Sequence, residues 1–199
     1  MVTEQKTEEK PQIMSKGWKR FWIVAAIVVA IVLIPYGLWR LAGGSFKPKP
    51  EAACTNADTR NQFVAAVRAN PNDFKASYNY ADYVYGCKEF DTAIQAYGQA
   101  TRIADQLGSN VSPDDRFKAR FGVGLAYLYN QNYPEAQSQL KTLSDENPNN
   151  PLVLYTYGTA LRPSDPTKAI AAFQQAIKID PNSSIAQQAQ RALDELKNR

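Results

Sequence analysis

The chain of 199 residues contains no histidine. This absence excludes histidine-based acid–base catalysis, Ser-His-Asp and Cys-His nucleophile pairs, and zinc or haem sites with histidine ligands. A Walker loop is also missing, and Gly122 and Gly124 form only a fragment of a glycine-rich fingerprint within an apolar helical pattern. Asp114 and Asp115 have no neighbouring base and are typical of a helix start. We therefore expect no enzymatic activity, no cofactor, no metal site and no small-molecule substrate.

An excess of basic charge is missing from most of the chain. The net charge is +4, but residues 1–44 hold six Lys or Arg and three Glu, which leaves 17 basic and 16 acidic side chains in residues 45–199. A nearly neutral domain offers no footprint for phosphate groups. The sequence therefore argues against nucleic acid as a partner.

A single long apolar run is present, from Phe21 to Trp39, and its 19 residues include no charge. As a helix it would measure about 28 Å, close to the ~30 Å hydrocarbon thickness of a bilayer. Tryptophans stand near both edges of the run, where amphipathic rings favour the headgroup level. We expect a transmembrane helix over 17–42 that contacts lipid through 21–39.

The distribution of Lys and Arg predicts the orientation of this helix. Residues 1–20 carry five of them, whereas the first stretch after the run carries three. The positive-inside rule then favours a single-pass protein of the cell membrane, with its N-terminus in the cytoplasm and residues 45–199 outside it. A cleaved signal peptide is the main alternative, although the run is long for one and no small-x-small cleavage site follows it.

The remainder of the chain repeats one pattern. Ala76–Ala93 and Ala119–Ala136 align without a gap, and Leu152–Ala169 follows the same scheme. Each segment continues into a second amphipathic helix, and two of these helices end at an Asn-Pro or Asp-Pro pair, which cannot extend a helix. A small residue occupies the same place in every first helix: Ala81, Gly124 and Gly158.

This pattern resembles the tetratricopeptide repeat, a 34-residue helix–turn–helix unit. The small residue, the aromatic three residues before the second-helix alanine, and the closing Pro-Asn all match. The family's tryptophan is replaced by Ser77 and Arg120, and an insertion around Gln106–Asp115 separates the first two repeats. The resemblance implies an all-α, right-handed solenoid after the transmembrane helix, whose terminal helices serve as caps.

The expected organisation has four parts. A disordered cytoplasmic tail covers 1–16, the transmembrane helix 17–42, a linker 43–56 and the repeat domain 57–199. Within the repeat domain we expect a half repeat, three repeats and a capping helix, at 57–72, 73–110, 116–149, 150–182 and 183–198.

Cys54 and Cys87 are the only cysteines. They lie 17 residues before and 16 residues after Pro71, where an antiparallel helical hairpin would turn. Positions equidistant from the apex of a hairpin face each other, so a disulfide is geometrically possible and would add roughly 3–4 kcal/mol of stability. The alternative is two unrelated buried thiols. A catalytic redox role is not indicated, because no Cys-x-x-Cys motif is present.

The resemblance also implies that the first helices line the concave side of the solenoid. Tyr78, Phe121 and Tyr155 occupy equivalent outward places and form an aromatic ladder, which either lines a binding groove or completes the core between helices. The family's carboxylate clamp of Lys and Asn is absent, because Tyr78 and Asp82 stand there in the first repeat. The full set of expected groove residues is Tyr78, Asp82, Tyr85, Phe121, Leu125, Tyr129, Tyr155, Thr159 and Arg162.

From these features we expect a membrane-anchored scaffold or assembly factor that presents a groove to a partner protein outside the cytoplasm. An extended or helical apolar segment would suit the groove. The alternative is a constitutive structural subunit of a membrane complex that contacts its partners through the transmembrane helix. Translocon-associated anchors and cytochrome-c maturation subunits have a similar architecture, which is an analogy only.

Overall fold

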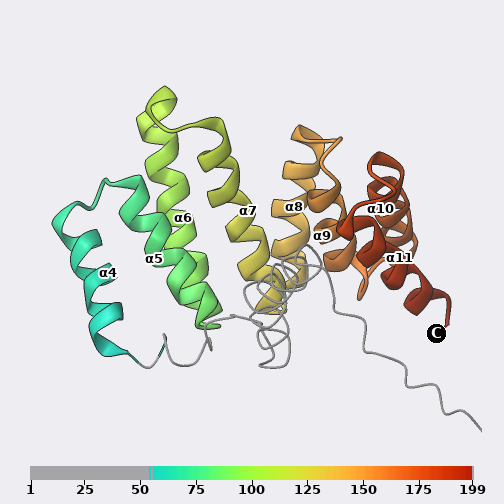
Figure 1. Cartoon of the computed structure of the whole chain (residues 1–199), viewed down its shortest axis with the longest axis horizontal. Helices are drawn as coiled ribbons and strands as arrows, with labels where there is room; N and C mark the ends of the chain where they lie inside the picture. The colour runs from blue at the N-terminus through green and yellow to red at the C-terminus, as the bar shows by residue number, and fades with distance from the viewer. Residues whose placement is uncertain (1–53, 55, 199) are drawn as a thin grey trace, which may run out of the picture. The chain divides into compact units, whose positions relative to one another are not determined.

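The computed structural model of this protein describes residue 54 and residues 56–198 (Figure 1). In this part of the chain the secondary structure consists of eight α-helices and one short 3₁₀ helix, without strands. The expected tail and transmembrane helix, and nearly all of the linker, fall outside the described residues. Among the helices that the structure describes, none is long and apolar enough to cross a membrane.

The helices follow one another at short intervals. In chain order they are α4 (Ala57–Ala69), α5 (Phe74–Gly86), α6 (Phe90–Leu107), the 3₁₀ helix η2 (Gly108–Asn110), α7 (Pro113–Tyr129), α8 (Tyr133–Glu146), α9 (Pro151–Leu161), α10 (Pro166–Ile179) and α11 (Ser184–Lys197). Three helix–turn–helix pairs result, α5–α6, α7–α8 and α9–α10, with α4 before them and α11 after them (Figure 1). This arrangement is the expected all-α helical repeat.

Helix starts are specified by local chemistry. Asn56, Asp73 and Asn150 each precede a helix and accept hydrogen bonds from two backbone N–H groups of its first turn. Ser112 and Ser183 each accept one such bond. These side chains satisfy donors that have no partner within the helix. Proline occupies the first turn of α7, α8, α9 and α10, where its missing N–H is harmless.

The helix pairs form two layers. α5 contacts α7, α7 contacts α9 and α9 contacts α11, whereas in the described chain no second helix, α6, α8 or α10, contacts the second helix of the next pair. Equivalent helices lie closest together on the inside of a curved stack. We therefore call the side formed by α5, α7, α9 and α11 the inner face.

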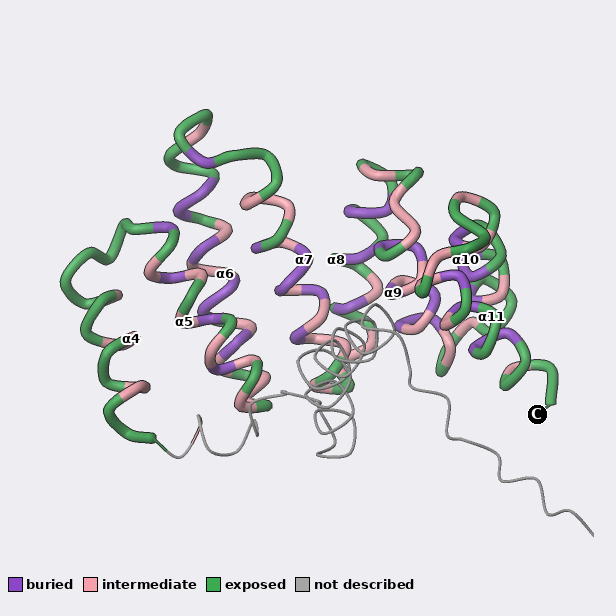
Figure 2. Tube along the Cα trace, viewed as in Figure 1, coloured by how far each residue is buried: buried purple, intermediate pink, exposed green. Residues whose placement is uncertain are grey.

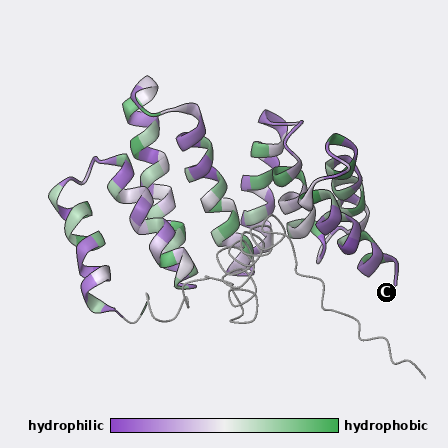
Figure 3. Ribbon diagram, in the orientation of Figure 1, coloured by the Kyte–Doolittle hydropathy of each residue, from purple (hydrophilic) through white to green (hydrophobic). Residues whose placement is uncertain are grey.

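Buried residues recur along the helices from α5 to α11 (Figure 2), and hydrophobic residues recur along the same helices (Figure 3). Small residues in the first helices allow the second helices to approach closely. A methyl group at Gly124 would lie 2.8 Å from Leu140, and one at Gly158 would lie 2.7 Å from the ring of Phe173. The small residue at this position of the repeat is therefore a packing requirement.

The two ends of the stack differ in burial. α4 contains no buried residue, whereas α11 buries Ala186, Ala189, Ala192 and Leu193 against the last pair. α6 is the longest of the described helices, with 18 residues, and η2 continues from it. The end of α6 and η2 cover the first half of Gln106–Asp115, where the sequence predicts an insertion, and α7 begins within the second half.

Candidate functional site

A pocket of about 490 Å³ opens on the inner face between the second and third helix pairs. Leu125 and Tyr129 line it from α7, and Tyr155 and Thr159 from α9. Arg162, directly after α9, completes the group of expected groove residues that line this cavity. Five of the nine residues predicted from the repeat register are thus brought together here. We call this cavity the inner pocket.

The inner pocket also has walls that the repeat register did not indicate. They come from the end of α7, from the turn after it, from the first residue of α8, and from positions next to the predicted ones on and after α9: Leu128, Gln131, Tyr133, Thr156 and Pro163. Tyr133, the first residue of α8, is half-buried. Its place directly after the turn from α7 was the available signal, because this end of the helix pair borders the pocket.

Arg162 supplies the charged group of the inner pocket. Its guanidinium lies 2.7 Å from the carboxylate of Glu195 in α11, and 23% of its side chain is exposed. The ion pair fixes the guanidinium and offsets its charge. The pocket wall is mixed, with aliphatic and aromatic side chains beside hydroxyl groups, the amide of Gln131 and one paired cation.

A second group of residues lies beside the pocket on the inner face. The hydroxyl of Tyr97 donates a hydrogen bond to the carboxylate of Asp82. Tyr97 is buried at 4% exposure, and its ring meets Tyr78 edge-on at 5.8 Å and Tyr85 edge-on at 6.2 Å between ring centroids. Tyr85 in turn meets Tyr129 edge-on at 5.9 Å. We call Asp82 and these four tyrosines the aspartate patch.

Tyr129 joins the two features, because it belongs to the aspartate patch and also lines the inner pocket. It is 57% exposed although its ring stacks on Phe90 with centroids 5.9 Å apart. An exposed aromatic ring held by two neighbouring rings is a rigid contact surface that loses little conformational entropy on binding.

Tyr78, Tyr85 and Tyr97 of the patch favour their neutral form. Burial raises the pKa of Tyr78 to about 12, and the carboxylate of Asp82 adds to the shift. Burial also raises the pKa of Tyr85 to about 12, with Tyr129 and Asp82 contributing. For Tyr97, burial and the hydrogen bond to Asp82 raise the pKa far above the usual range. A phenolate is disfavoured next to a carboxylate in a partly dry site.

Phe121 departs from the predicted ladder. Only 9% of it is exposed, and it belongs to a buried cluster with Leu140, Leu143 and Val153. Its ring stacks on Phe117 with centroids 5.7 Å apart. Of the two interpretations left open for this position, groove or core, the structure places Phe121 in the core. Its equivalents Tyr78 and Tyr155 stay half-buried.

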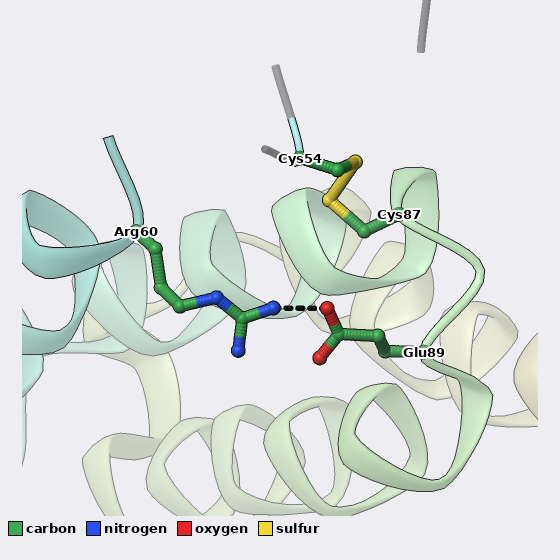
Figure 4. The surroundings of a disulfide bond; sticks show 4 residues. All are labelled: Cys54, Arg60, Cys87 and Glu89. Atoms are coloured by element: carbon green, nitrogen blue, oxygen red, sulfur yellow. Dashed lines mark hydrogen bonds and ion pairs between the residues drawn. A yellow bond between two sulfur atoms is a disulfide. The ribbon is translucent and has the colours of Figure 1, made fainter. Parts of the chain in front are cut away.

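The structure joins Cys54 and Cys87 by a disulfide, with their Cα atoms 5.4 Å apart (Figure 4). Cys87 is the residue that ends α5, and Cys54 lies just before α4. An ion pair between Arg60 of α4 and Glu89 lies next to the disulfide (Figure 4). Phe63 stacks on Tyr83 with ring centroids 4.9 Å apart. These contacts hold α4 against α5 and the start of α6. They lie outside the second and third helix pairs, which form the inner pocket.

Metal-binding chemistry is not represented in the described residues, which contain no group of three or more His, Cys, Asp or Glu side chains suited to a metal ion. The inner pocket and the aspartate patch bring together aromatic rings, hydroxyl groups, the carboxylate of Asp82 and the Arg162–Glu195 ion pair.

Solved structures with a similar fold include two of MamA. One is MamA from residue 41 to the end, from Desulfovibrio magneticus RS-1, with a TM-score of 0.55 and 14% identity over 94% of this chain and 96% of that chain. The other is the MamA RS-1 ArsTM double mutant, with a TM-score of 0.55 and 15% identity over 94% of this chain and 97% of that chain. At this identity the likeness shows the fold alone.

Among curated proteins, none matches the sequence. A family model for the tetratricopeptide repeat matches residues 56–107 and 123–184, which together make up more than half of the chain. The two matched stretches contain α4, α5 and α6 in the first and α8, α9 and α10 in the second. The chain therefore belongs to the tetratricopeptide repeat family.

Proposed function

We propose that this protein is an interaction scaffold or assembly factor that binds a partner protein on its inner face. The observation that carries this proposal is the continuity of the inner pocket with the aspartate patch through Tyr129. Domains of this family mediate protein–protein interactions. Tyrosine is enriched among residues that contribute most to such interfaces, because its ring buries apolar area and its hydroxyl remains hydrogen-bonded.

The inner pocket accommodates one apolar side chain of a partner segment. Leu125 and Tyr155 supply apolar walls, while the hydroxyl of Thr159 makes its hydrogen bond back to the backbone of its own helix. With that hydroxyl already bonded, Thr159 presents mainly its methyl group. An apolar side chain is therefore better suited to this cavity than a charged one.

Two substitutions test the inner pocket. Tyr129→Ala should remove the exposed ring, and Thr159→Arg should fill the cavity, so both should abolish partner crosslinking from the inner face in cells. Leu107→Ala is the matched control, because Leu107 is an exposed apolar residue at the end of α6, with 37% exposure, and does not line the pocket. Unchanged crosslinking in both pocket variants would refute the proposal, provided that circular dichroism shows them to be folded.

We further propose that the repeat domain is held outside the cytoplasm by a retained transmembrane helix over 17–42. The uncharged run Phe21–Trp39 and the excess of Lys and Arg before it support this placement. The Cys54–Cys87 disulfide adds support, because disulfides persist mainly in oxidising compartments. We also propose the domain limits that the sequence predicts, with repeats at 73–110, 116–149 and 150–182.

Protease accessibility tests this placement. A protease added to intact cells or spheroplasts should digest the repeat domain and spare an epitope tag at the N-terminus. If the repeat domain becomes sensitive only after the membrane is broken, it lies in the cytoplasm. The proposed orientation of the transmembrane helix would then be wrong.

The second candidate is a structural subunit that contacts its partners through the apolar run itself, with the solenoid as a spacer. The run is the specific observation that favours it. Replacing 21–39 by an unrelated spanning sequence should abolish assembly in this case and leave it intact if the inner face is the contact. The pocket variants described above should show the reverse behaviour.

A further inference from the structure

The carboxylate of Asp82 is exposed on the inner face and is held in place by its neighbour. Asp82 is one turn from Tyr78 and Tyr85 on α5, and its side chain accepts the hydrogen bond from Tyr97 of α6. In the described part of the chain no Lys or Arg forms an ion pair with it. By contrast, Arg162, the cation of the inner pocket, is paired with Glu195. The inner face thus presents an unpaired negative charge at a fixed position.

The rings around Asp82 strengthen the preference for positive charge. Tyr78 and Tyr85 each meet Tyr97 edge-on, and Tyr85 meets Tyr129 edge-on, so the carboxylate that Tyr97 holds belongs to a cluster of four aromatic rings. The face of an aromatic ring is electronegative and attracts Lys or Arg at a short distance. Tyr78, Tyr85 and Tyr97 are neutral at physiological pH, since the ordinary pKa of tyrosine near 10 already lies above it and burial raises their pKa values further. Asp82 consequently remains the single formal charge of the patch.

The inner pocket, with its aliphatic and aromatic walls, adjoins this negative patch. Tyr129 forms part of both, so the pocket and the patch share one side chain. A single extended partner segment can then fill the pocket with an apolar side chain and approach Asp82 with a basic one. Charge complementarity identifies the chemistry of that segment.

We propose that the inner face selects partner segments that carry a Lys or Arg close to a bulky apolar residue, with Asp82 as the residue that determines specificity. The proposal rests on the function proposed above and adds the class of ligand. Its polarity is opposite to that of a carboxylate clamp, which binds a negatively charged chain end through Lys and Asn side chains.

Synthetic peptides of defined sequence provide the probe. Each is a fluorescent ten-residue peptide with blocked ends, with one leucine at a fixed place and one lysine one to six residues away in a Gly-Ser background. Matched series carry glutamine or glutamate instead of lysine. Binding to the full-length protein in detergent is measured by fluorescence anisotropy at low and high salt.

We expect at least one lysine spacing to bind about fivefold to tenfold more tightly than its glutamine match, and the glutamate series to bind most weakly. Asp82→Asn should remove the difference between lysine and glutamine, and Asp82→Lys should make glutamate the preferred series. Asp105→Lys is the matched control, because Asp105 is an exposed aspartate near the end of α6. It should leave the preference unchanged.

The outcomes separate this inference from the proposed function. Peptides that bind without charge preference, and lose binding in Thr159→Arg, would overturn the role of Asp82 and leave the inner pocket as a docking site. A preference for glutamate in the unaltered protein would overturn it as well. If no peptide of any series binds to the unaltered protein, both the ligand class and the pocket's role in binding short segments are refuted.

Discussion

A single residue can serve both packing and recognition at the inner face. Tyr97 of α6 does so, because its buried ring packs on Gly122 while its hydroxyl donates a hydrogen bond to Asp82. A methyl group at Gly122 would lie 2.6 Å from the Tyr97 ring, closer than real contacts allow. The glycine therefore sets the position of the ring, and the ring sets the position of the carboxylate.

Gly122→Ala should lower the free energy of unfolding by about 1–2 kcal/mol, because overpacking outweighs the helix propensity that alanine adds. Gly98→Ala in α6 is the matched control. A methyl group there would meet only Arg102, at 3.7 Å, so the substitution should be neutral or stabilising by up to about 1 kcal/mol. Denaturant titrations of both variants check the difference, and equal effects would contradict the packing argument.

Tyr78 and Tyr85 of the aspartate patch should make stability depend on pH under alkaline conditions. Their folded pKa values, about 12 for Tyr78 and Tyr85, lie above the usual value near 10, so the stabilisation is fully present below pH 10. It should be lost as the pH rises from about 10 through 12, because the unfolded state ionises first. Absorbance near 295 nm should show these tyrosines ionising later in the folded than in the urea-unfolded protein. Coincident curves would contradict the prediction.

Helices of this chain could be predicted from the sequence because their signals are local. Asp73 and Asn150 mark helix starts, and Pro148 and Pro181 follow helix ends. Equivalent helices of successive repeats also turn the same side toward the inner face. Five of the predicted groove residues therefore line the inner pocket. Register alone thus places a side chain on a face of a helix.

Contacts between helices were less accessible from the sequence. The bond from Tyr97 to Asp82 depends on the distance between α6 and α5, which no pattern within either helix encodes. For Phe121 the sequence left both groove and core open, because burial of a ring depends on its polarity as well as its position. Tyr78 and Tyr155 carry a hydroxyl and stay half-buried, whereas Phe121 stacks on Phe117 and turns inward.

α4 is the element whose attachment depends most on single contacts. It buries no residue of its own, and it is held by the disulfide, the Arg60–Glu89 pair and the stacking of Phe63 on Tyr83. Closing a loop with a sequence separation of 33 residues restricts the unfolded chain and stabilises by roughly 3–4 kcal/mol. The exposed ion pair contributes much less.

Reduction of the disulfide should therefore loosen α4 selectively. Amide hydrogen exchange in 57–69 should accelerate on addition of a dithiol reductant, while exchange in 166–179 stays unchanged. The paired variant Cys54→Ser with Cys87→Ser should behave like the reduced protein and be insensitive to the reductant. Native protein with two freely alkylated thiols would show that the bond is absent, and the prediction would fail.

At the largest scale that the structure describes, residues 56–198 form a linear stack in which each helix pair contacts only its neighbours. Stability of such a stack is close to a sum of local terms, so damage at one end should not spread to the other. At the C-terminal end, Leu193 and Ala189 of α11 pack with Phe173 of α10 in one buried cluster. α11 therefore closes the apolar interior of the last pair.

Leu193→Ala should destabilise the C-terminal end by about 2–5 kcal/mol, because it leaves a cavity in that cluster. Exchange should accelerate in α10 and α11 and remain slow in α6. Gln190→Ala, an exposed position of the same helix, is the matched control and should change little. Uniform acceleration across all helices would indicate a single cooperative unit and contradict the local picture.

The unequal contacts of the two layers also have a mechanical consequence. The inner helices touch one another in series, and the outer helices of the described chain do not. Small rotations between successive pairs can open or tighten the curve while each pair remains intact. We expect the repeat domain to be elastic. It should extend reversibly under tension and bind a chain on its inner face more tightly when it shortens again.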